Sequence, residues 1–244
     1  MGEITVMKRY ETKYILSKEQ LKFLRASLHG HMVIDEYGKT SIASIYYDTP
    51  DYRLIRASIE KPAYKEKLRL RSYGLAENNS PVYLEIKRKV EGIVYKRRIK
   101  TSENVASSFL ANKSNTIGDN QIAKELLYFR NYYGVLEPKI MIIYDRTSYA
   151  EVEGDIRLTI DENPRYRSFD LNLHSSMEGQ LLLPPGGAIL EIKVQQEMPL
   201  WLVSILSEGK VYQGSFSKVG EAYKQIMLNN VLSTERRPRH EITV

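Results

Sequence analysis

The segment KEKLRLR, residues 65–71, decides the fold because cations and apolar residues alternate along it. Successive side chains of a β-strand point to opposite faces. Lys65, Lys67, Arg69 and Arg71 would therefore share one face, with the leucines on the other. Cations this close on one strand face repel each other unless a polyanion, or interleaved carboxylates with a metal, neutralise them. The segment predicts a strand with an anion-binding face.

The same alternation recurs in several other segments. Charged or polar residues at two-residue spacing, with apolar residues between them, are Arg9, Glu11 and Lys13; Tyr83, Glu85, Lys87 and Lys89; Arg157, Thr159 and Asp161; and Glu191 and Lys193. One basic strand alone would more often be an ordinary solvated surface. Several such strands must bring their charged faces together, either on a shared surface or inside a closed barrel. We favour the barrel interior.

Composition limits the class of protein and the kind of site. The chain has 244 residues, of which 42% are hydrophobic and 27% charged, which suits one large domain or two small ones. Cysteine is absent, so disulfides and thiolate metal sites are excluded. The four histidines are scattered, and a divalent ion would have to use carboxylate and phosphate oxygens. A net charge of +6 indicates anionic partners in general.

The order of patterns along the chain predicts an α+β fold. Ser17 and Gln20 form a capping box that opens a helix, and Asp119 caps another helix that ends at Gly134. Further helices are expected after Pro199 and after Ser217. Strands are expected at residues 9–16, 42–48, 64–73, 82–90, 93–100, 141–150, 155–161 and 189–194. These elements predict an antiparallel β-barrel with helices packed on its apolar outside.

The remaining segments complete the predicted organisation. Residues 163–187 are weakly patterned and rich in Pro and Gly, which suggests a mobile loop beside a site. We expect a single domain over residues 1–232 and a disordered basic tail over residues 233–244. The chain has no apolar run long enough to span a membrane and no signal-peptide core near its N-terminus. We therefore expect a soluble, cytoplasmic protein.

One short motif resembles a nucleotide-binding loop but fails the comparison. Gly38, Lys39 and Thr40 match the end of a P-loop, yet Val33 occupies the position of its first glycine. The backbone turn that cradles phosphate cannot form as that motif specifies. Any phosphate binding must therefore come from side chains.

A set of short motifs, in chain order, carries a family resemblance. They are RYETKY (9–14), SIYYDT (44–49), KLRLRSYG (67–74), YLEIKRK (83–89), YKRR (95–98), YDR (144–146), RLTID (157–161), LEIK (190–193) and SFSK (215–218). Together they resemble the VTC domain, the polyphosphate polymerase branch of the CYTH-like triphosphate tunnel metalloenzymes. The resemblance covers nearly the whole chain apart from the tail. It implies a barrel whose charged tunnel binds triphosphate or polyphosphate with a divalent metal.

The resemblance also implies roles for individual residues. The phosphate-binding candidates are Lys13, Lys67, Arg69, Arg71, Lys87, Lys96, Arg146, Arg157, Lys193 and Lys218. Among them Arg69, Arg71, Lys87, Arg146 and Arg157 are the catalytic candidates. Glu191 matches the metal-binding glutamate of the family. Glu11 and Glu85 are further candidates that either bind metal or form salt bridges inside the barrel, and the sequence leaves both roles open.

The function that follows is a polyphosphate polymerase that depends on Mn²⁺ or Mg²⁺. It would transfer the γ-phosphate of ATP to a growing polyphosphate chain and release ADP. One alternative is a triphosphatase that uses the same barrel to deliver the phosphoryl group to water. Another is a non-catalytic module that binds RNA or polyphosphate. The basic faces carry carboxylates and few aromatic rings, which favours a metal over nucleic acid, so we expect no specific nucleic-acid partner.

Overall fold

The computed structural model describes residues 10–60, 62–77, 80–91, 93–195 and 197–235. Arg9, which begins the first motif, lies outside these residues, as does Gly92 between two predicted strands. Residues 236–244 of the predicted tail also lie outside them. No helix within the described ranges is long and apolar enough to cross a membrane.

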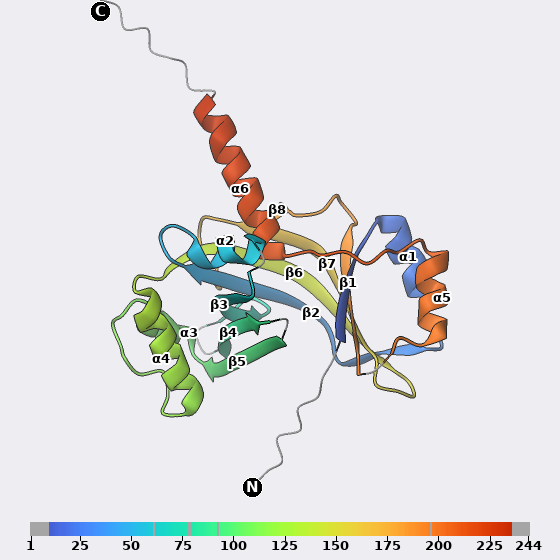
Figure 1. The fold of residues 1–244 in the computed structure, drawn as a ribbon, viewed down its shortest axis with the longest axis horizontal. Helices are drawn as coiled ribbons and strands as arrows, with labels where there is room; N and C mark the ends of the chain where they lie inside the picture. Colours follow the sequence, from blue (N-terminus) through green and yellow to red (C-terminus); the bar gives the residue numbers. More distant parts are fainter. Residues whose placement is uncertain (1–9, 61, 78–79, 92, 196, 236–244) are drawn as a thin grey trace, which may run out of the picture.

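The protein is built on one nine-stranded sheet in which every ladder is antiparallel. The order across the sheet is β1 (Tyr10–Leu16), β9 (Ala188–Val194), β7 (Arg157–Arg167), β6 (Glu137–Glu151), β2 (Met32–Asp48), β3 (Tyr64–Tyr73), β4 (Val82–Val90) and β5 (Ile93–Thr101). The short strand β8 (Gln180–Leu181) pairs with β7. Figure 1 shows how this sheet curls. Within the described residues no ladder joins β5 to β1, so the sheet is barrel-like but not closed.

Two apolar clusters cover the outer face of the sheet. Behind β3, β4 and β5, residues such as Leu70 and Leu84 pack against α3 (Glu103–Leu110) and α4 (Gln121–Tyr133). Behind β1, β9 and β7, residues such as Leu190 pack against α1 (Lys18–Ser27) and α5 (Leu200–Glu208). The predicted placement of helices on the apolar outside is confirmed for these four helices. Burial of both clusters leaves the charged faces of the strands on the inside of the curl.

The helix α6 (Lys218–Glu235) differs because it starts on the inner face. Tyr46 lies opposite Arg69 in the β2–β3 ladder, so the two side chains share that face. Tyr46 also belongs to an apolar cluster that includes Val219 and Ala222 of α6 and Ile55 of α2 (Arg53–Glu60). Beyond this contact α6 projects away from the sheet, as Figure 1 shows. The helix continues to Glu235, past the position where the tail was expected to begin.

The predicted helix ends are largely confirmed. Ser17 and Gln20 form the full capping box at the start of α1. Gly134 ends α4 with a φ of 73°, a left-handed conformation that favours glycine. The N-cap of α4 is Asn120 instead of Asp119, because the Asn120 side chain accepts the hydrogen bond from the Ala123 backbone N–H.

The segment expected to be a mobile loop is partly a strand. β7 continues to Arg167 after a register shift opposite Ile143–Asp145, where Asn163 has a φ of 46°. This bulge changes which face the following residues present. Arg167 then donates hydrogen bonds to the backbone carbonyl oxygens of Asp170, Asn172, Ser176 and Glu178. The chain after β7 therefore surrounds a buried guanidinium that hydrogen-bonds to its backbone at four points.

Candidate phosphate-binding tunnel

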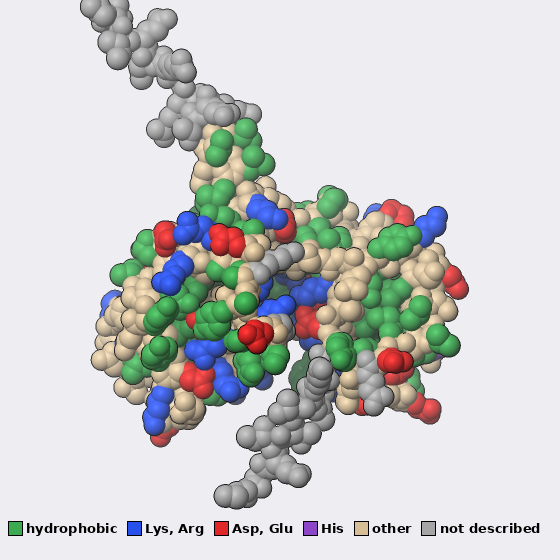
Figure 2. Space-filling model, viewed as in Figure 1, with side chains coloured by type: hydrophobic (Ala, Val, Ile, Leu, Met, Phe, Trp, Pro, Cys, Tyr) green, Lys and Arg blue, Asp and Glu red, His purple; other side chains and the backbone are tan. Residues whose placement is uncertain are grey.

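Strand register places the predicted cations on one concave inner face. In the β3–β4 ladder Lys67 lies opposite Lys87 and Arg69 opposite Glu85. On the other side of the curl, Lys13 of β1 lies opposite Glu191 of β9. Figure 2 shows basic and acidic side chains gathered in the hollow at the centre of this view. Residues far apart in sequence therefore form one charged tunnel.

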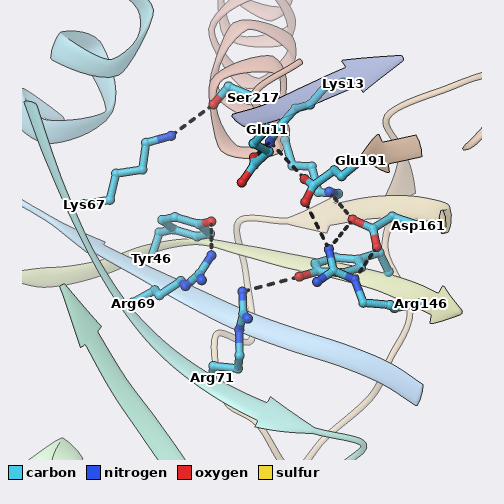
Figure 3. Close-up of polar contacts among 12 residues, drawn as sticks. Glu11, Lys13, Tyr46, Lys67, Arg69, Arg71, Arg146, Asp161, Glu191 and Ser217 are labelled. Carbon is cyan, nitrogen blue, oxygen red and sulfur yellow. Dashed lines mark hydrogen bonds and ion pairs between the residues drawn. The ribbon is translucent and has the colours of Figure 1, made fainter. Parts of the chain in front are cut away.

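The two arginines of β3 are each held by neighbouring side chains. Arg69 donates from Nε to the Glu85 carboxylate at 2.7 Å and from Nη1 to the Tyr46 hydroxyl at 3.2 Å. Arg71 donates from Nε to Ser44 Oγ at 3.1 Å and from Nη2 to the Tyr144 hydroxyl at 3.3 Å. Figure 3 shows both arginines projecting toward the same space. Their guanidinium groups are therefore oriented before any anion binds.

Glu85 balances charge in this part of the tunnel. Its side chain is 1% exposed, with Oε2 2.7 Å from Arg69 Nε and Oε1 2.8 Å from Lys96 Nζ. The Arg71 guanidinium lies 3.9 Å away. Burial alone would raise the pKa of Glu85, but Arg69, Arg71 and Lys96 outweigh it and lower the pKa to about 2. Because cations occupy both of its oxygens, the structure favours the salt-bridge role of Glu85 over the metal role.

Tyr46 and Lys67 have pKa values displaced toward neutrality. Burial alone would raise the pKa of Tyr46, but Arg69, Lys67 and Arg71 lower it to about 7. Burial lowers the pKa of Lys67 to about 8, and nearby Lys87 and Arg69 act in the same direction. The Lys67 ammonium donates a hydrogen bond to Ser217 Oγ at 3.2 Å. The net charge of this region therefore changes with pH in the physiological range.

A second ion-pair centre lies on the opposite side of the tunnel, and its central residue, Asp161, was not among the predicted site residues. Asp161 of β7 is fully buried and accepts hydrogen bonds from Arg146 Nε at 2.6 Å and Nη2 at 2.8 Å. It also accepts one from Lys218 Nζ at 2.5 Å. Burial would raise the pKa of Asp161, but Lys218 and Arg146 hold it below the usual range. Asp161 thereby joins β7, β6 and the first residue of α6.

Glu191 belongs to the same centre, as Figure 3 shows. Its Oε1 lies 2.9 Å from Lys13 Nζ and its Oε2 lies 3.8 Å from Arg146 Nη2. Burial would raise the pKa of Glu191, but Lys218, Lys13 and Arg146 keep it well below the usual range. Glu11 lies at the margin, 3.4 Å from Lys13 Nζ. Glu191 and Asp161 are thus held ionised close to each other.

These carboxylates fit a divalent cation that also binds phosphate oxygens. Within the described ranges no three Asp, Glu or His side chains gather into a complete metal cage. Mg²⁺ is commonly bound by one or two carboxylates together with substrate phosphates, so a complete cage is not required. Thr159 lies opposite Glu191 in the ladder, and its hydroxyl is buried without a hydrogen-bond partner among the described residues. Both oxygens of Asp161 are paired with Arg146 and Lys218, as those of Glu85 are paired with Arg69 and Lys96. Glu191 Oε2, which is 3.8 Å from Arg146 Nη2, is the more open oxygen and is the kind of hard ligand that Mg²⁺ and Mn²⁺ prefer.

The other predicted residues divide between the tunnel and its rim. Burial lowers the pKa of Lys87, whose charge interacts with those of Glu11 and Lys13 on the far side of the curl. Arg157 also has an inward register, opposite Lys193, but its side chain is 53% exposed and lies 3.9 Å from Asp35. Arg157 and Lys193 therefore lie at the tunnel mouth, apart from the central cluster.

Comparison with known proteins identifies the family. The VTC domain model matches residues 8–227. The chain belongs to the VTC domain family. No protein of curated function matches it.

Solved structures similar to this VTC domain support the same fold. A candidate adenylate cyclase from Bacillus halodurans has 17% identity and a TM-score of 0.55, over 85% of this chain and 92% of its own. A candidate adenylyl cyclase from Hippeastrum, described as having a dominant triphosphatase activity, has 17% identity and a TM-score of 0.56. That similarity covers 96% of this chain and 99% of the Hippeastrum chain. The triphosphate tunnel fold implied by the sequence is confirmed.

Several tunnel residues of the VTC domain were not predicted as site residues, although the sequence contained signals for some of them. Asp161 ends the alternating RLTID motif, which already indicated an inward face. Tyr46 and Tyr144 lie in the SIYYDT and YDR motifs, but tyrosine is also common in the shell of a sheet. Ser44 and Ser217 carry no charge, so charge patterning could not identify them.

Proposed function

We propose that this VTC domain is a polyphosphate polymerase that depends on a divalent metal ion. It would transfer the γ-phosphate of ATP to the end of a polyphosphate chain and release ADP. The observation that carries the proposal is the convergence of cations from opposite sides of the curled sheet on one inner space. Arg69 and Arg71 come from β3, whereas Lys13 and Arg146 come from β1 and β6. Family membership and the tunnel fold support an enzyme that acts on triphosphates.

The chemistry of phosphoryl transfer fits this arrangement. A terminal oxygen of the chain forms a bond to the γ-phosphorus while the bond from that phosphorus to the β–γ bridging oxygen breaks, and ADP leaves with the electron pair. The protein must hold the reacting groups in line and neutralise charge on the transferring oxygens. Arg69 and Arg71 would grip phosphate oxygens through their N–H groups. Glu85, Tyr46 and Tyr144 keep those guanidinium groups oriented.

On the other side, Lys13, Arg146 and Lys218 would neutralise phosphate charge. Each of them is already paired with Glu191 or Asp161, so an incoming phosphate competes with a carboxylate for the same cations. A divalent ion held by Glu191 would supply charge neutralisation to the phosphate oxygens. The lysines act as point charges, which lets a repetitive polymer move between equivalent positions.

A product assay separates the three candidate functions. Pure protein is incubated with ATP and Mn²⁺ or Mg²⁺, and ADP, free phosphate and acid-insoluble polymer are measured. ADP together with polymer supports the polymerase. ADP with free phosphate and no polymer would identify a triphosphatase, as described for the Hippeastrum protein. Polyphosphate binding without turnover of ATP or triphosphate would identify a binding module.

A further inference from the structure

The basic surface of the tunnel continues to the exposed edge strand β5. In the β4–β5 ladder, Arg98 lies opposite Glu85 and Lys100 opposite Tyr83. Glu85 and Tyr83 in turn lie opposite Arg69 and Arg71 of β3. Directly opposed residues of an antiparallel pair share one face. Two rows of side chains therefore run from the central arginines to the edge of the sheet.

The alternate residues of β5 confirm this orientation. Ile99 is buried in the apolar cluster behind the sheet that includes α3 and α4. The Arg97 guanidinium lies 3.6 Å from the Glu125 carboxylate of α4, on the same outer side. Arg98 and Lys100 must then point to the tunnel side, and both are exposed.

This edge has more positive charge than its neighbours neutralise. Lys96, on the same face, is paired with Glu85, which Arg69 also uses. The Arg98 guanidinium lies 4.9 Å from the centre of the Tyr83 ring. In the described part of the chain, neither Arg98 nor Lys100 has a carboxylate within salt-bridge distance. A row of cations without counter-charge is a site for an external anion.

We propose that the inner face of β5, centred on Arg98 and Lys100, binds the part of a polyphosphate chain that extends from the central arginines to the open edge of the sheet. This site rests on the proposed function, because the chain must be continuous with the one held by Arg69 and Arg71. The Tyr83 ring already contacts Arg98, and Tyr95 lies opposite Arg88, so it points to the outer side. The face offers mainly cations, and its half-exposed ring, Tyr73, packs edge-on against Tyr83, so competition by single-stranded nucleic acid is included in the test.

The site has a consequence for chain length. A triphosphate held by the central arginines gains nothing from Arg98 and Lys100, whereas a long chain contacts both regions at once. Linked contacts increase the affinity for the longer ligand without any change in the central site. Affinity should therefore increase with chain length, and the increase should depend on the edge residues.

The test compares two sides of one strand. The double variant Arg98→Gln/Lys100→Gln removes charge from the inner face, and Arg97→Gln removes charge from the outer face as the matched control. Dissociation constants are measured for triphosphate and for long-chain polyphosphate at one fixed salt concentration, and melting temperatures verify folding. Exposed ion pairs are individually weak, so the double variant should lose about tenfold in long-chain affinity. Its affinity for triphosphate should change much less, and Arg97→Gln should resemble the wild type.

Three outcomes would overturn the edge site. These are unchanged long-chain binding in the double variant, an equal loss in Arg97→Gln, and competition by single-stranded RNA as effective as that by polyphosphate of equal charge. Any of them leaves the tunnel proposal intact if the wild type still binds triphosphate and makes polymer. A wild type that binds neither triphosphate nor polyphosphate would overturn the proposed function and the edge site together.

Discussion

The inner faces of the two halves of the sheet carry different charge. On β3, β4 and β5 most inward residues are basic or tyrosine, with Glu85 as the balancing carboxylate. On β1, β9 and β7 the inward cations alternate with Glu11, Glu191 and Asp161. Each half is backed by its own apolar cluster and its own pair of helices.

This difference indicates that one half of the tunnel mainly binds anions, whereas the other can also bind a metal ion. A surface with excess cations binds anions whatever their reaction state, so it contributes to substrate and transition state alike. A surface with paired carboxylates and cations can in addition hold a metal ion and change its charge when a phosphate arrives. Binding and turnover should therefore respond differently to mutations in the two halves.

The largest expected effect is on turnover in Glu191→Gln. The change removes the proposed metal-binding oxygen but keeps every cation of the tunnel, so ATP turnover should fall to background. Triphosphate binding should persist or tighten, because Lys13 and Arg146 lose a competing partner. The measurements are product formation and calorimetric binding, with Glu11→Gln at the exposed margin as the comparison. Full turnover in Glu191→Gln would remove the assigned metal site and with it the division between the halves.

The next effect is on stability. Asp161→Asn leaves Arg146 and Lys218 buried without their counter-charge, which should lower the free energy of unfolding by about 3 kcal/mol. Triphosphate should restore part of the loss, because an anion bound by the folded state stabilises it by mass action. Thermal unfolding with and without triphosphate measures both quantities. A melting temperature equal to that of the wild type would show that Asp161 does not stabilise the half of the sheet formed by β1, β9 and β7.

Arg69→Ala should weaken binding and turnover together. The loss of one charge-assisted contact costs about 1.5 to 3 kcal/mol, or roughly ten- to a hundredfold in both the dissociation constant and kcat/KM. Arg88→Ala is the matched control, since Arg88 lies on the adjacent strand but pairs with Glu66 and Glu125 on the outer side. Equal effects from the two variants would mean that the inner face has no special role.

The smallest expected effect is a change of triphosphate affinity with pH, which arises from Tyr46 of β2 and Lys67 of β3. Above a pKa of about 7 Tyr46 becomes negative, and above about 8 Lys67 becomes neutral. Both changes remove positive charge without removing a phosphate contact, so triphosphate binding should weaken as pH rises from 7 to 9, by less than in Arg69→Ala. Tyr46→Phe should show a shallower decline, which separates the protein from the titration of the ligand. Identical pH profiles would exclude Tyr46 as the titrating group.

Alternation in the sequence predicted eight of the strands and their faces, but it missed β8 and the first part of β2, which begins at Met32 and not at residue 42. KEKLRLR and YLEIKRK became neighbouring strands with Arg69 and Glu85 on one face, as two-residue periodicity predicts. Periodicity gives the face of a residue but not its depth along the tunnel. Arg157 therefore has the predicted orientation and still lies at the mouth.

Other features depend on contacts that a local pattern does not contain. The bulge at Asn163 breaks the alternation in β7, so a strand was read as a loop. The start of α6 packs on the inner face because Val219 and Ala222 meet apolar residues of β2 and β6, which are distant in sequence. The predicted phosphate roles of individual residues and the limits of the domain stay predictions.

The position of α6 affects how the two halves of the tunnel are connected. In a closed barrel, the number and stagger of the strands set the diameter. Here no ladder joins β5 to β1 within the described residues, so the sheet alone does not set the width of the tunnel. At the start of α6, Ser217 accepts a hydrogen bond from Lys67 of β3, and Lys218 is bound to Asp161 of β7. The start of α6 is therefore bonded to both halves of the tunnel, to β3 on one side and to β7 on the other.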